Sequence, residues 1–82
     1  MITRDEVRGL MNEILSRQGK RVLDDESASL RMIGFRSLDF SELALRVERR
    51  IGRELNFDAS RLRAISSVAD TLDFFEEASR RA

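Results

Sequence analysis

The chain changes character at Gly34-Phe35-Arg36-Ser37-Leu38-Asp39, where a long polar stretch gives way to an amphipathic segment. Beyond it, apolar residues recur at the 3.6-residue spacing of one helical stripe, namely Phe40, Leu43, Ala44, Val47 and Ile51. The pattern predicts a helix over residues 37–55 with that stripe in the core. Ser37 then stands in the first turn, where unpaired backbone N–H groups and the helix dipole favour a negatively charged group such as a phosphate ester.

Two leucines of this helix fall outside the apolar stripe. Leu38 and Leu45 lie together on nearly the opposite side, alongside Glu42 and Arg49. One interpretation is that one of them packs under the preceding loop, since single exposed leucines are ordinary. The other is a small apolar contact framed by charges, suited to a transient partner. The residues alone leave both interpretations open.

A separate helix is expected before this segment. Residues 3–16 combine a capping-box pattern, Thr3 with Glu6, with an apolar stripe of helical period. That stripe comprises Val7, Leu10, Met11 and Ile14. Residues 19–36 lack a sustained period and predict a long loop, with Gly34 in a tight turn just before the next helix.

The last third of the chain predicts two more helices. Residues 58–64 suit a short helix with Asp58 or Ser60 as its cap. A final helix would begin at Ser66-Ser67, and its buried side would comprise Val68, Leu72, Phe75 and Ser79. The order predicts an all-α fold, an irregular four-helix bundle of three longer helices and one short helix, with a long loop between the first two. We expect a single domain spanning residues 1–82.

Composition restricts the chemistry open to this chain. Its 82 residues include neither Cys nor His, which removes disulfides, thiolate chemistry, the usual zinc sites and the commonest general base. Lys+Arg is 15 and Asp+Glu is 15, so the basic excess typical of a nucleic-acid binder is missing. The sequence shows no signal-peptide pattern and no segment long and apolar enough for a membrane span. We expect a cytoplasmic protein without catalytic residues, a metal site or a nucleic-acid partner.

Two motifs resemble those of the acyl carrier protein family. The first is Leu30-x-x-Ile33-Gly34-Phe35-x-Ser37-Leu38-Asp39, followed by Glu42-Leu43 and an amphipathic helix. The second, Ser66-Ser67-Val68-x-Asp70-x-Leu72-x-x-Phe75, is similar to the opening of the family's final helix. The resemblance covers roughly residues 23–79, and its specificity lies in the helix order and in the position of the serine after the long loop.

The resemblance implies a carrier protein and not an enzyme. Ser37 would carry a 4′-phosphopantetheine arm, attached by a phosphopantetheinyl transferase that uses coenzyme A, and the thiol of the arm would hold an acyl group as a thioester. A monomeric carrier of this kind presents its cargo in turn to acyl-loading and acyl-transfer enzymes of lipid or secondary metabolism. In the family the second helix binds partners, which here implies Leu38, Asp39, Glu42, Leu45, Arg46, Glu48 and Arg49. The two leucines would be the apolar anchors, and the acids would be charges at the rim.

Three features depart from the usual family pattern. Arg36 stands where the family has aspartate, and it can contact the phosphate or repel a standard transferase. The second helix is acidic in carriers of fatty acid synthesis, but in this chain it carries Arg46, Arg49, Arg50 and Arg53. Phe40 would narrow or reshape an acyl cavity between the second and third helices. These departures favour a specialised carrier that serves a dedicated pathway.

Two alternatives remain open at this point. The arm could carry an aminoacyl or peptidyl group, because those carriers share the fold and the position of the serine. The chain could also be an unmodified helical adaptor that has kept the carrier fold without the arm, and Arg36 is the residue that favours this alternative.

Overall fold

The computed structural model describes residues 2–20, 25–55 and 59–81, with only the backbone of residues 59 and 81. The helices are α1 (Arg4–Arg17), α2 (Leu30–Ile33), α3 (Ser37–Ile51), α4 (Ala59–Arg63) and α5 (Val68–Arg81). Within these ranges the extended structure is limited to an isolated antiparallel bridge between Ser29 and Ser67. The all-α prediction is confirmed.

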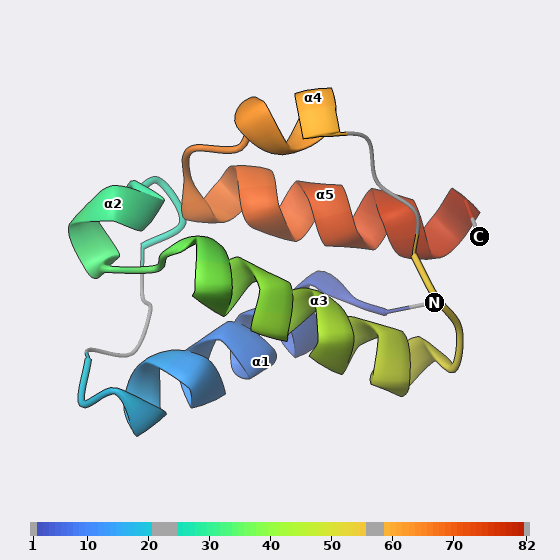
Figure 1. The fold of residues 1–82 in the computed structure, drawn as a ribbon, viewed down its shortest axis with the longest axis horizontal. Coiled ribbons are helices and arrows are strands. Elements are labelled where there is room, and N and C mark those ends of the chain that lie inside the picture. Colours follow the sequence, from blue (N-terminus) through green and yellow to red (C-terminus); the bar gives the residue numbers. More distant parts are fainter. Residues whose placement is uncertain (1, 21–24, 56–58, 82) are drawn as a thin grey trace.

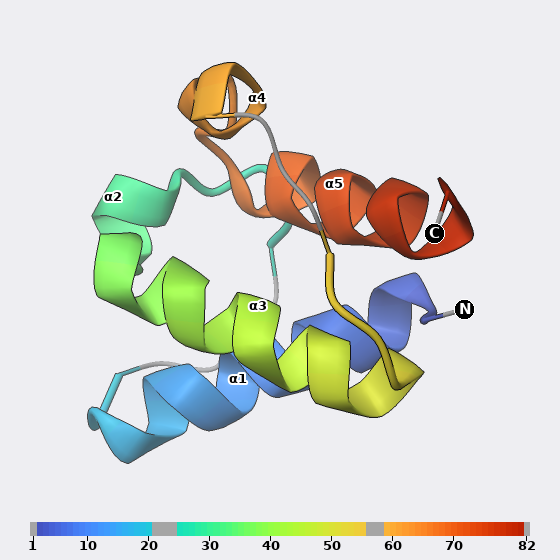
Figure 2. The same cartoon turned by 45° about the vertical axis from the view of Figure 1, so that its right-hand side comes forward.

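Three long helices, α1, α3 and α5, pack on one another and form the body of the molecule (Figure 1). The short helix α4 lies along α5 on the side away from α1, and α2 lies beside the start of α3 in both views (Figure 2). The arrangement is the irregular bundle expected from the sequence. The one-turn helix α2 is an addition, since it lies within the segment predicted as a loop.

The predicted helix starts are confirmed at both ends of the chain. The Thr3 hydroxyl accepts from the Glu6 N–H at 3.2 Å, and the Glu6 carboxylate accepts from the Thr3 N–H at 3.0 Å. At the start of α5, the Asp70 carboxylate accepts from the backbone N–H groups of Ser66 and Ser67, each at 3.1 Å. Both arrangements satisfy N–H groups that have no partner within the helix itself.

Two helix boundaries differ from the prediction. Helix α3 ends at Ile51 and not near residue 55, because Gly52 adopts a left-handed conformation (φ 78°) and its N–H bonds the Glu48 carbonyl. Glycine is favoured at that position because it has no Cβ to clash. Ser60 lies within α4 and does not precede it, whereas the alternative cap Asp58 lies outside the described residues.

The core collects the stripes predicted from helical period. All four stripe residues of α1 are buried, as are Val68, Leu72, Phe75 and Ser79 of α5. In α3, Leu43, Ala44 and Val47 are buried, while Phe40 and Ile51 are half-buried against the same cluster. The Phe40 ring packs on Phe74 and Phe75, with centroid distances of 6.0 and 5.2 Å. These aromatic contacts join the first turn of α3 to the middle of α5.

Candidate functional site

Ser37 is the first residue of α3, and its side chain is exposed. The chain reaches it through Gly34, which ends α2 in the left-handed conformation with φ 76°. The first helical bond of α3 runs from the Phe40 N–H to the Arg36 carbonyl at 2.9 Å. The three N–H groups before Phe40 therefore have no acceptor within the helix. The structure places the Ser37 hydroxyl beside the positive end of α3, as the sequence predicted.

The start of α3 is capped from one side only. The Asp39 carboxylate accepts from the Arg36 backbone N–H at 2.8 Å, but Arg36 returns no bond because a guanidinium has no acceptor. A serine or aspartate at the position of Arg36 would accept a bond from the N–H groups of the first turn. Without such a cap, those N–H groups are available to an acceptor from outside, such as a phosphate oxygen.

Asp39 differs from its expected role as a rim charge. Its side chain is only 7% exposed, and its second oxygen accepts from the Gln18 side chain at 2.6 Å. The carboxylate joins the end of α1 to the first turn of α3. Since both oxygens have partners inside the fold, Asp39 positions the start of α3 and presents little charge to solvent.

The segment before Ser37 is tied to the start of α5. The Leu30 N–H donates to the Ser66 carbonyl at 2.9 Å, and the Val68 N–H donates to the Ala28 carbonyl at 3.0 Å. The same segment is also held by Lys20, whose ammonium donates to the Gly34 carbonyl at 2.6 Å. These bonds fix α2 and the turn that leads into Ser37.

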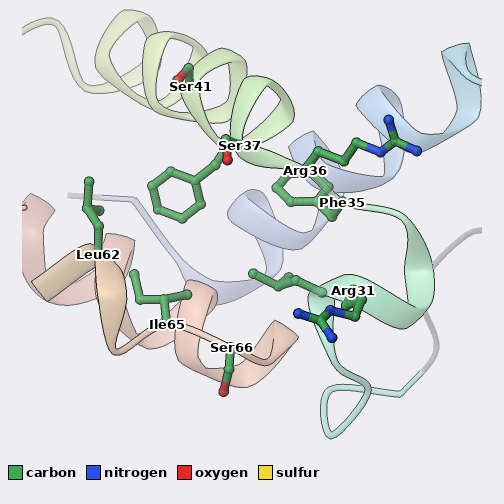
Figure 3. Close-up of a pocket in the computed structure, with 10 residues that line it drawn as sticks. Arg31, Phe35, Arg36, Ser37, Ser41, Leu62, Ile65 and Ser66 are labelled. Carbon is green, nitrogen blue, oxygen red and sulfur yellow. The ribbon is translucent and has the colours of Figure 1, made fainter.

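An open hollow of about 640 Å³ lies beside Ser37, between the start of α3 and the segment from α4 to α5 (Figure 3). Its lining is largely apolar and comprises Leu30, Phe35, Phe40, Leu62 and Ile65. The polar groups along it are Arg31, Arg36, Ser37, Ser41 and Ser66. The hollow therefore presents an apolar wall and several polar groups next to the Ser37 hydroxyl.

Arg36 contributes to the lining of the hollow, but its guanidinium group does not face the hollow. Figure 3 shows the guanidinium directed away from the hollow. The sequence suggested a contact between Arg36 and a phosphate on Ser37. In this conformation the backbone of Arg36 serves the start of α3, and its side chain lies in solvent.

The two leucines outside the apolar stripe are exposed. Leu38 is 84% exposed and Leu45 is 55% exposed, so the interpretation that one of them packs under the loop is wrong. Met32 of α2 is also 84% exposed and was not foreseen. Its one-turn helix is too short to show a hydrophobic period, so the sequence carried no signal for it.

The charged residues expected at the partner-binding helix fall into two groups. Glu42 pairs with Arg46 at 2.8 Å, and Arg46 also pairs with Glu13 of α1 at 2.8 Å. The Glu48 carboxylate accepts from the Leu55 N–H at 2.7 Å. Arg49, by contrast, is exposed. The Arg46–Glu13 pair joins α3 to α1, whereas the Glu42–Arg46 and Glu48–Leu55 contacts lie within α3 and the segment that follows it.

Over the described ranges, no group of three or more Asp or Glu residues is placed to hold a metal ion. No helix in those ranges is long and apolar enough to cross a membrane.

The comparison with solved structures found an acyl carrier protein from Thermotoga maritima. The two chains superpose with a TM-score of 0.71 and are 24% identical, over 95% of this chain and 92% of that one. The likeness shows that this chain has the acyl carrier protein fold. No protein-family model and no curated protein matches the sequence.

Proposed function

We propose that this chain is a carrier protein whose Ser37 hydroxyl is the attachment point of a 4′-phosphopantetheine group. The observation that carries the proposal is the position of Ser37, exposed at the first turn of α3 and at the edge of an apolar hollow. The fold shared with an acyl carrier protein supports the same conclusion.

The residues around Ser37 suit both parts of such a group. The N–H groups of the first α3 turn, which lack a side-chain cap, would bind the phosphate oxygens. The apolar walls formed by Phe40, Leu62 and Ile65 suit an acyl chain. When bound, the group supplies the thiol that this cysteine-free chain lacks, so that an acyl group can be held as a thioester.

Attachment would require a separate enzyme. In forming the phosphodiester, the Ser37 oxygen bonds to phosphorus, its proton passes to a base, and the adenosine bisphosphate portion of coenzyme A leaves. The chain has no His to act as that base, and no carboxylate is hydrogen-bonded to Ser37 among the described residues. The partners would thus include a phosphopantetheinyl transferase, then enzymes that load and transfer acyl groups in a specialised lipid or secondary-metabolite pathway. The cargo could equally be an aminoacyl or peptidyl group.

The test is intact-mass measurement after incubation with coenzyme A and a broad-specificity transferase. The expected gain is one phosphopantetheinyl group, absent in Ser37→Ala. Ser41→Ala is the matched control, because Ser41 is also exposed and lines the same hollow one turn further along α3. A gain that persists in Ser37→Ala would overturn the assignment.

A second candidate is an adaptor that has the carrier fold but bears no arm. Arg36 favours it, since a cation replaces the usual aspartate beside the serine. The distinguishing variant is Arg36→Asp. Modification of Arg36→Asp but not of the parent chain by the same transferase, together with an unmodified mass for protein isolated from its source, would support the adaptor.

A further inference from the structure

All three acidic residues of α3 have partners within the fold. Asp39 accepts from Arg36 and Gln18, Glu42 pairs with Arg46, and Glu48 accepts from the Leu55 N–H. An acid already bonded inside the fold gains less from a cation outside it, because binding would exchange one partner for another. The acids of α3 are therefore poorly placed to attract a basic partner.

The arginines of the same region fall into two groups: two form ion pairs with α1, and three form no ion pair with the described residues. Arg46 and Arg50 pair with Glu13 and Glu6 of α1 at 2.8 and 3.1 Å. Arg31, Arg36 and Arg49 are exposed, and none of them forms an ion pair with the residues that the structure describes. The available charge is positive, although the whole chain is neutral.

Exposed apolar side chains occur on the same two helices. Leu38 and Leu45 are seven residues apart, which places them within about 20° of each other around α3, and Arg49 follows one turn later. Helix α2, with Met32, lies beside the start of α3 (Figure 2). We name this surface the α2–α3 face; it consists of Arg31, Met32, Leu38, Leu45 and Arg49, and the Glu42–Arg46 ion pair lies beside the two leucines. Along α3 it extends for about 17 Å.

We propose that the α2–α3 face docks proteins whose binding patch surrounds an apolar pocket with Asp and Glu carboxylates. Leu38 and Leu45 would enter the pocket, while the unpaired guanidinium groups would form bidentate contacts at its rim. A patch rimmed with Lys or Arg would face Arg31 and Arg49 and be repelled. This inference rests on the proposed function, because a carrier needs partner proteins. It adds that the binding patches of those partners are acidic.

The test uses two synthetic amphipathic helical peptides with the same leucine face, one flanked by Glu and one by Lys. Each is titrated at low salt into the full ¹⁵N-labelled Ser37→Ala chain. The Glu peptide should bind at least about tenfold more tightly, with the largest chemical-shift changes at Met32, Leu38, Leu45 and Arg49. Arg49→Glu should weaken it about two- to fivefold. Arg63→Glu, the same change at an exposed residue of α4, should have no effect.

Equal affinity for both peptides, or shifts on another face, would overturn the proposal. Equal losses in Arg49→Glu and Arg63→Glu would also overturn it, because net charge alone would then explain binding. Binding to phosphatidylserine vesicles through the same residues, without discrimination between the peptides, would assign the face to an anionic membrane surface instead. Since residue 37 is alanine throughout, none of these results depends on whether the parent chain is modified.

Discussion

Gln18 and Asp39 join the end of α1 to the first turn of α3 through a side-chain hydrogen bond of 2.6 Å. The same carboxylate accepts from the Arg36 backbone N–H at 2.8 Å. Asp39 thus fixes both the direction of α3 and the position of the residue just before Ser37. It holds the start of this helix through the Arg36 N–H and leaves the N–H groups of the first turn without a side-chain cap.

Asp39→Ala should lower the free energy of unfolding by about 2 kcal/mol, because it leaves the Gln18 amide and the Arg36 N–H without their acceptor. Urea denaturation measures the loss. Glu54→Ala is the control, since Glu54 is an exposed carboxylate just beyond α3 and should change stability by less than about 0.5 kcal/mol. Similar losses in the two variants would show that Asp39 does not hold the helix start.

Two glycines should respond in opposite directions to the same substitution. Gly34→Ala should destabilise by about 1–2 kcal/mol, because φ is 76° and the new Cβ would lie 3.0 Å from the Lys20 Nζ atom. Gly9→Ala, inside α1 with nothing within 4 Å of the new Cβ, should stabilise by about 0.5–1 kcal/mol. Thermal unfolding followed by circular dichroism measures both changes. Changes of the same sign would contradict the turn described at Gly34.

Leucines of α3 should differ according to the side of the helix they occupy. Leu38→Ser should change stability by less than about 0.5 kcal/mol, because the side chain is 84% exposed. Leu43→Ala should cost about 2–5 kcal/mol, because that side chain is fully buried. Chemical denaturation of both variants measures the contrast. A large loss for Leu38→Ser would show that it is a core residue and remove it from the α2–α3 face.

The free energy of unfolding should fall at low pH, partly because the Asp70 carboxylate becomes protonated. Hydrogen bonds from the Ser66 and Ser67 backbone N–H groups hold the pKa of Asp70 below its ordinary value of 3.8. The unfolded chain therefore takes up this proton more readily than the folded chain does. The stabilisation is complete above the ordinary pKa and is lost as the pH falls through the lowered one.

Denaturation between pH 6 and about pH 2 should therefore show a shallower decline for Asp70→Asn, which keeps an acceptor oxygen but does not titrate. Some decline should remain, since hydrogen bonds from Thr3 and Ser27 lower the pKa values of Glu6 and Asp25 in the same way. Glu54→Gln is the matched control for removing a carboxylate. An Asp70→Asn curve parallel to that of the parent chain would refute this role.

The features that the sequence predicts correctly are those that depend on the local hydrophobic period and on local capping residues. The buried stripes of α1 and α5, the Thr3–Glu6 box and the position of Ser37 at a helix start could all be read from neighbouring residues. The predicted end of α3 near residue 55 overlooks the stop signal at Gly52, which adopts a left-handed conformation directly after Ile51.

Features that depend on distant contacts could not be read in this way. The role of Asp39 requires Gln18, which is 21 residues away. The exposure of Leu38 and Leu45 depends on where the preceding segment runs, and that segment is held by bonds to the start of α5. The hollow beside Ser37 likewise forms only when residues from α2, α3 and α4 come together.

The half-buried ring of Phe40 lines the hollow and also contacts Phe74 and Phe75. Any molecule bound in the hollow would therefore contact a ring that also packs between α3 and α5. A ligand that binds only the folded chain stabilises it by RT ln(1 + L/Kd), where L is the free ligand concentration, and so raises its melting temperature. Filling of the hollow should therefore appear as a change in the stability of the whole bundle.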